Sequence, residues 1–296
     1  MSSIKKLYST YFNLLLSEGT RKKGESVIIT ISIVSFLIHV LLIFLVDQEI
    51  IVARDNIGLL NDPIAAIYTP FSFILIYEVY LLVYHLPKST SYYIGKQYEI
   101  ITLIVIRNIF KDLASLDFTT SWFQDKYDLQ FTYDIVTTLI LFFLIYYFHR
   151  LNKKDKVGAD LPQDTIRLIE RKKIMALVLV PVFLVMATYS LSIWAYDSLN
   201  AWQNSNHIMN DLNTIFFDEF FTILILADVL LLLFSLFHTD RFSSVIRNSG
   251  FIISTILIRM SFGTEGLLKN ILVIVAVLFG VLILLIFNQY RRLVNH

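Results

Sequence analysis

The chain has 296 residues, of which 56% are hydrophobic and 17% are charged. This composition is too apolar for a soluble domain of that size and is typical of a multi-pass, all-α membrane protein. The lack of cysteine excludes disulfides, cysteine-ligated metals, iron–sulfur clusters and thiol chemistry.

Residues 1–26 are predicted to form an amphipathic cytoplasmic pre-helix. Ile4, Leu7 and Tyr11 recur at helical spacing beside lysines, a pattern typical of a helix lying in the membrane interface. The alternative interpretation is a frayed cytoplasmic tail. The apolar segment that follows, 27–46, starts too late and is too long to be a cleaved signal peptide.

Eight apolar segments approach the length of about 20 residues that a membrane-spanning helix needs. They are 27–46, 64–86, 98–116, 131–149, 174–196, 216–238, 249–262 and 267–290. The seventh is short, so it either begins earlier, at Val245, or forms a re-entrant element.

The orientation is predicted from the positions of the basic residues. Most of the 25 Lys and Arg residues fall before the first segment, after every even-numbered segment, or in the linker 151–173. The connections on the other side are mainly acidic. Since basic residues favour the cytoplasmic side, both termini are predicted to be cytoplasmic and the number of spans to be even. Residue usage resembling that of an AT-rich genome favours a bacterial inner membrane.

The two halves of the chain share a pattern of charges. The sequence I-x-I-R-x-x-F occurs at 104–110 and again at 256–262. It places Arg107 and Arg259 within otherwise apolar segments. An even number of spans per half gives both halves the same orientation. We therefore predict two parallel four-helix repeats, related by an axis along the membrane normal. Their predicted bounds are 27–150 and 174–296, joined by the basic linker 151–173.

Ionisable residues inside these segments are the candidate functional residues. An arginine near the centre of a membrane helix costs roughly 2.5–3.5 kcal/mol on insertion scales, so a partner is expected. We predict two intramembrane ion pairs, Glu78–Arg107 and Asp228–Arg259. Lys111 lies one helical turn after Arg107 and adds a further charge to the same face of the helix as the first pair. The pairs either fix the packing of each hairpin or line a hydrated ion path; the sequence leaves both open.

His39 lies in the first apolar segment, near two serines on the same helical face. Such a histidine is more often hydrogen-bonded to a neighbouring helix than part of a proton relay, and the relay is kept as the second interpretation. No residue spacing indicates a metal site, and no cofactor is expected.

The sequence lacks the common motifs of catalysis and nucleic-acid binding. The sequence contains no phosphate-binding glycine loop, metalloprotease motif, nucleophile elbow or nucleic-acid-binding pattern. We therefore expect no enzymatic activity and no nucleic-acid partner. The basic linker is expected to touch anionic lipid heads at the cytoplasmic face. A homo-oligomer and a protein partner are both compatible with the sequence.

The second and third segments carry a family resemblance. Glu78, followed by Tyr93-Ile94-Gly95-Lys96-Gln97-Tyr98 and an Ile-rich segment, resembles the second-to-third helix hairpin of voltage-sensor-type four-helix membrane domains. The resemblance implies a similar bundle. It does not extend to voltage sensing, because the fourth segment of each half lacks an arginine ladder.

These features together favour an ion channel or ion-conducting membrane protein. The expected ion path runs near Glu78, Arg107, Lys111, Asp228 and Arg259. The alternative is a non-conducting membrane scaffold or partner subunit. A third interpretation is an intramembrane enzyme or lipid-handling protein.

Overall fold

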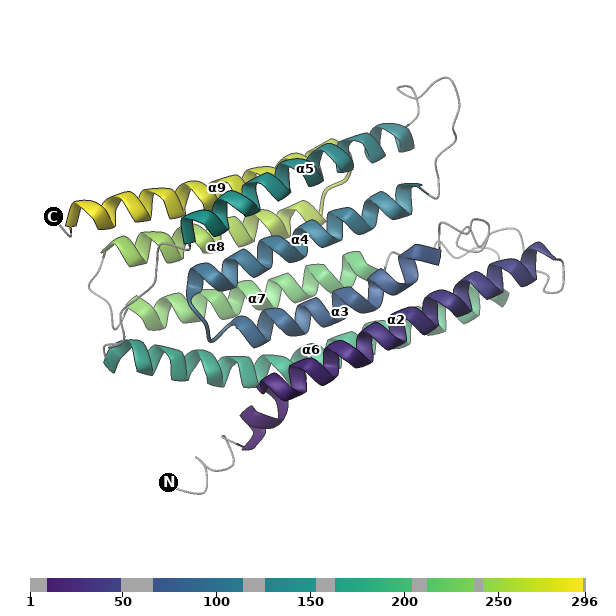
Figure 1. Ribbon diagram of the computed structural model, residues 1–296, viewed down its shortest axis with the longest axis horizontal. Coiled ribbons are helices and arrows are strands. Elements are labelled where there is room, and N and C mark those ends of the chain that lie inside the picture. Colours follow the sequence, from purple (N-terminus) through teal and green to yellow (C-terminus); the bar gives the residue numbers. More distant parts are fainter. Residues whose placement is uncertain are drawn as a thin grey trace. The chain divides into compact units, whose positions relative to one another are not determined.

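A computed structural model describes residues 10–48, 66–113, 126–152, 163–203, 212–236 and 242–294. The long elements in these ranges are all α-helices, which confirms the all-α class. They are α2 (Glu18–Asp47), α3 (Tyr68–His85), α4 (Thr90–Leu113), α5 (Lys126–Asn152), α6 (Gln163–Gln203), α7 (Leu212–Leu236), α8 (Phe242–Phe262) and α9 (Gly266–Val294), labelled in Figure 1.

Five helical segments of the described ranges are long and apolar enough to cross a membrane. They are Thr10–Asp47, Asp128–Asn152, Ile169–Tyr189, Ser243–Phe262 and Gly266–Leu293. A further apolar helix, Thr69–His85, is shorter. The helical transmembrane character is thereby supported, whereas the count of eight spans stays a prediction. The segment 249–262, which looked short in the sequence, belongs to the longer helix α8 that begins at Phe242.

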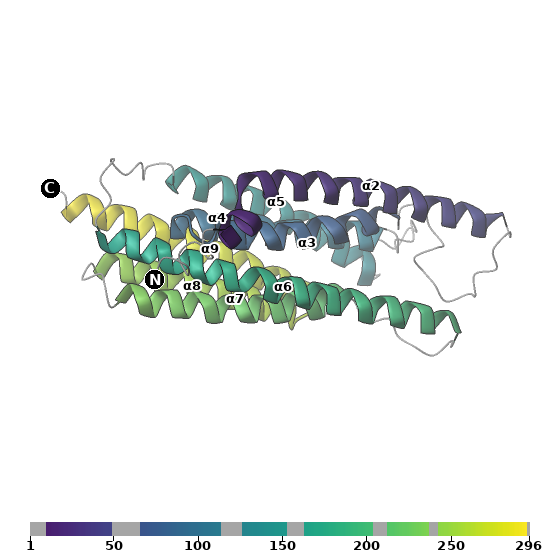
Figure 2. The same ribbon diagram turned by 90° about the horizontal axis from the view of Figure 1, so that it is seen from below.

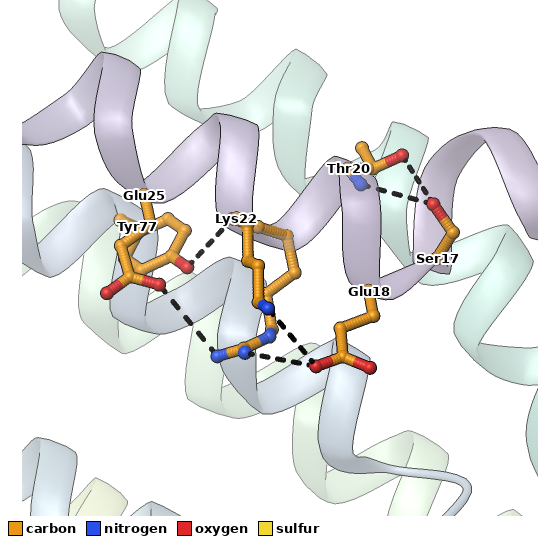
Figure 3. Close-up of polar contacts among 7 residues, drawn as sticks. Ser17, Glu18, Thr20, Lys22, Glu25 and Tyr77 are labelled. Carbon is orange, nitrogen blue, oxygen red and sulfur yellow. Dashed lines mark hydrogen bonds and ion pairs between the residues drawn. The ribbon is translucent and has the colours of Figure 1, made fainter.

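The start of α2 is set by Ser17, whose extended backbone (ψ 156°) interrupts the helical residues before it. Its side chain accepts a hydrogen bond from the backbone N–H of Thr20 at 3.1 Å (Figure 3). This N-cap satisfies a donor that the first helical turn leaves without a partner. The helix then runs unbroken from Glu18 to Asp47, across the boundary predicted at residue 26.

The chain divides into two compact units, each drawn from both halves of the sequence. Unit 1 comprises Met1–Leu81, Leu103–Asp134 and Pro181–Phe216. Unit 2 comprises Leu82–Thr102, Ile135–Val180 and Phe217–His296. The two four-helix repeats predicted from the sequence stay a prediction.

Unit 1 packs α2 against α3 through tyrosine side chains. The Tyr77 hydroxyl donates to the carbonyl oxygen of Arg21 at 3.1 Å (Figure 3), and the Tyr80 hydroxyl to that of Leu15 at 2.8 Å. Leu15 lies just before the N-cap Ser17, so the two contacts tie the start of α2 and the segment that precedes it to α3.

Unit 2 contains a tight hairpin formed by α8 and α9, which lie side by side (Figures 1 and 2). Three residues connect them, and Gly266 takes a left-handed backbone conformation with φ 65°, which glycine adopts at no steric cost. Close contact between the helices is possible at Gly250, where an added Cβ would lie 2.7 Å from Ile283.

Candidate functional site

A buried carboxylate, Asp228 of α7, is the centre of the polar core of unit 2. The side chain of Gln97 on α4 donates from Nε2 to Asp228 Oδ2 at 3.3 Å. Tyr93 lies one helical turn before Gln97, on the same face of α4, and its ring interacts with Asp228 as well. Both α4 side chains are almost fully buried, with 0% exposure for Gln97 and 2% for Tyr93.

Helix α8 fixes the orientation of the Gln97 carboxamide. The hydroxyl of Thr255 lies 2.9 Å from Gln97 Oε1 and 3.1 Å from the carbonyl oxygen of Phe251. An ionised carboxylate can only accept, so the amide nitrogen of Gln97 faces Asp228 and its oxygen faces Thr255, whose single hydroxyl proton is shared between Gln97 Oε1 and the Phe251 carbonyl. Asp228 is therefore held by a neutral donor whose own position is set by a neighbouring helix.

Lys172 of α6 is the cation that acts on Asp228. Its side chain is buried, and Nζ donates to the carbonyl oxygen of Lys88 and to Thr90 Oγ1, both at 3.2 Å. It attracts the Asp228 carboxylate electrostatically without being within ion-pair distance. We call Tyr93, Gln97, Lys172, Asp228 and Thr255 the Asp228 cluster.

A second chain of hydrogen bonds runs beside this cluster. Ser254 Oγ lies 2.7 Å from the carbonyl oxygen of Ala276 and 2.8 Å from the Tyr98 hydroxyl oxygen. Since Ser254 has one hydroxyl proton and a carbonyl can only accept, Tyr98 donates to Ser254, which donates to Ala276. The chain links α4, α8 and α9 inside the apolar core.

A half-exposed charged group lies near the start of α4. Glu99 accepts hydrogen bonds from Lys96 and from His149 Nε2, the latter at 2.8 Å. Gly95 makes this approach possible, because an added Cβ would lie 3.0 Å from the His149 ring. These contacts tie α4 to the end of α5.

Arg259, the arginine of the second predicted ion pair, contacts α7 through its Nε, which donates to Thr222 Oγ1 at 2.7 Å. Its pairing with Asp228 stays a prediction. Thr222 precedes Asp228 by six residues on α7, about 9 Å at 1.5 Å per residue.

The remaining predicted residues lie in unit 1. Arg107 is buried within α4, Glu78 belongs to α3, and their pairing stays a prediction. The side chain of Lys111 lies outside the described residues. His39 Nδ1 lies 2.6 Å from Thr69 Oγ1, so it is hydrogen-bonded to a neighbouring helix, as the first interpretation expected.

Sequence reasoning missed most of the Asp228 cluster. Lys172 lies among the basic residues that predict the orientation, and Gln97 lies in the segment that carries the family resemblance. The available signal was the spacing of Tyr93 and Gln97, which places two polar groups on one face of α4. Nothing in the local sequence indicated that this face meets α7. Among the described residues no cluster of His, Asp or Glu suitable for a metal ion is found.

Comparisons of the chain with protein-family models, with curated proteins and with solved structures find no match.

Proposed function

We propose that the protein is a multi-pass membrane protein that conducts an ion, with Asp228 on the ion path. The observation that supports this is a carboxylate buried in an apolar helix, held by a neutral amide and facing a buried lysine across a cavity. Ionisable residues inside membranes are costly and commonly mark ion or proton routes.

The proposed topology has eight spans in two parallel repeats, with both termini cytoplasmic in a bacterial inner membrane. The basic linker then lies at the cytoplasmic face, where Lys and Arg attract anionic lipid heads. In this arrangement Asp228 lies within the sixth span.

Ion flux into liposomes tests the proposal. Purified full-length protein is reconstituted, and uptake of Na⁺, K⁺, H⁺ and Cl⁻ is recorded with ion-sensitive dyes. The proposal expects flux of at least one ion from the wild type and its loss in Asp228→Asn. Glu219→Gln is the matched control, since Glu219 lies on the same helix with an exposed side chain. Folded protein that passes none of these ions would overturn the proposal.

A non-conducting scaffold or partner subunit is the second candidate, and α2 favours it. Large apolar side chains are exposed over most of its circumference, including Val27, Ile31, Val34, Ile38, Leu41 and Phe44. Lipid covers such a surface, and so would the apolar helix of another subunit. Under this candidate, joint replacement of the intramembrane charges by apolar residues leaves function intact.

A further inference from the structure

The Asp228 cluster borders a small cavity inside unit 2. Its polar lining includes Lys172 of α6, Asp228 of α7 and Tyr93 of α4, and its volume is about 30 Å³. That volume has room for about two water molecules. The other walls are mainly apolar, formed by Leu86, Ile94, Leu231, Leu232, Phe251 and Ile252.

The charges of the lining decide which occupant fits. A metal cation at Asp228 would meet the Lys172 ammonium in the same cavity, and an anion at Lys172 would meet the Asp228 carboxylate. Hard divalent cations also need more oxygen ligands than one carboxylate provides. Water fits beside both Lys172 and Asp228, because it accepts a hydrogen bond from an ammonium and donates one to a carboxylate.

The hydroxyl of Tyr93 also indicates that water occupies the cavity. It is buried and has no hydrogen-bond partner of good geometry among the described residues, although it interacts electrostatically with Asp228. A buried hydroxyl without a partner costs about 1–3 kcal/mol, and a bridging water removes that cost. Tyr93 lines the cavity, so a water there can reach it.

We propose that this cavity is a proton-exchange site, in which water connects Lys172 to Asp228 and Tyr93 orients it. The inference rests on the proposed function and names its ion as the proton. In the exchange, an N–H bond of the Lys172 ammonium breaks as that proton joins the water. An O–H bond of the same water breaks in turn, and a new O–H bond forms on the Asp228 carboxylate.

The exchange converts an ammonium and a carboxylate into a neutral amine and a neutral acid, and the water is restored. The net charge of the site does not change, which suits a low-dielectric interior where isolated charges are unfavourable. Other groups facing the pair are Gln97 and Tyr93 of α4 and Arg247 of α8, whose positive charge acts on Lys172.

Proton uptake by liposomes containing the full-length protein tests the site. A potassium diffusion potential drives the flux, a pH-sensitive dye inside reports protons, and Na⁺ and K⁺ uptake is measured in parallel. We expect wild-type proton flux that slows in D₂O. Asp228→Asn should abolish it, Lys172→Met should reduce it strongly, and Tyr93→Phe should reduce it several-fold.

Three neighbouring substitutions serve as controls, each outside the cavity lining: Glu219→Gln on α7, Lys173→Met on α6 and Tyr92→Phe on α4. All three should transport protons close to the wild-type rate. Monodisperse elution and wild-type helicity are required of each variant. If Asp228→Asn does not fold, the proton flux of Tyr93→Phe tests the site instead, because this substitution removes only one hydroxyl.

Each failure has a distinct signature. Flux of Na⁺ or K⁺ without protons would overturn the proton-exchange site and leave ion conduction in place. Proton flux that Asp228→Asn and Tyr93→Phe leave unchanged would also overturn the site. Folded protein that moves no ion would overturn both the site and the proposed function.

Discussion

The hydroxyl of Tyr98 lies against the backbone of Gly280, so that a Cβ atom added to the glycine would be 1.6 Å from the Tyr98 oxygen. This contact brings α4 close to α9 and allows Tyr98 to reach Ser254. A small residue at a helix contact is a common way for membrane helices to approach each other closely. The polar chain in this core thus depends on one missing methyl group.

Gly280→Ala is predicted to destabilise the protein by about 1–3 kcal/mol or more, because overpacking a dense core forces side chains and backbone to shift. Thermal unfolding in detergent measures the effect. Gly24→Ala is the matched control, since its added Cβ would lie at an ordinary 3.6 Å from Tyr77. Equal unfolding temperatures for Gly280→Ala and the wild type would contradict the Tyr98 contact.

Gln97→Leu is predicted to destabilise the protein because it removes the neutral donor from the buried Asp228. Leaving a buried polar group without its partner costs about 1–3 kcal/mol, and more for a charge. Adding Asp228→Leu should recover part of this loss, since replacing both partners by apolar groups is often nearly neutral. A double-mutant cycle measured by denaturant unfolding tests the coupling. Purely additive effects of the two substitutions would show that the Gln97–Asp228 hydrogen bond contributes nothing.

Ser17→Ala is predicted to fray the first turn of α2, at a cost of about 1 kcal/mol in local stability. Hydrogen exchange of the amides just after Ser17 measures this directly. Thr30→Ala provides the control, because the Thr30 hydroxyl bonds only the carbonyl oxygen of Ser26 within the same helix. Faster exchange in Ser17→Ala and unchanged exchange in Thr30→Ala is the expected outcome. Unchanged exchange in Ser17→Ala would show that Ser17 does not cap the start of the helix.

The proposed topology can be mapped with single cysteines, since the chain has none of its own. Cysteine at Gly158, in the basic linker, should resist a membrane-impermeant thiol reagent applied to intact cells. Cysteine at Asp62 or Asp125, in the acidic connections, should be labelled. Labelling at 158 from outside would contradict the cytoplasmic placement of the linker.

The sequence predicts the helices better than their partners. Apolar runs and the basic residues around them indicated helical membrane segments, because both patterns are local. The contact between Gln97 and Asp228 joins positions far apart in the chain, and nothing local specifies which helix faces α4. Lys172 has a contact that the sequence does not predict for a related reason. It belongs to a basic run of the kind found at membrane surfaces, yet its long side chain turns inward to the α3–α4 connection.

Helix ends were the other weakness of sequence reasoning. The sequence predicts a seventh segment that begins at residue 249 or at Val245, whereas α8 begins at Phe242. Arg259 of this helix contacts Thr222, six residues before Asp228 on α7. Such errors arise because the ends of a helix depend on caps and tertiary contacts that hydropathy does not report.

The most direct test of ion conduction is the current across a planar bilayer containing the purified protein under an applied voltage. The wild type and Glu219→Gln should carry current in at least one of the NaCl, KCl and acidic-buffer solutions. Asp228→Asn, folded and present in equal amount, should carry none. Equal currents from Asp228→Asn and the wild type would remove Asp228 from the path, and a folded wild type that is silent in every solution would contradict conduction itself.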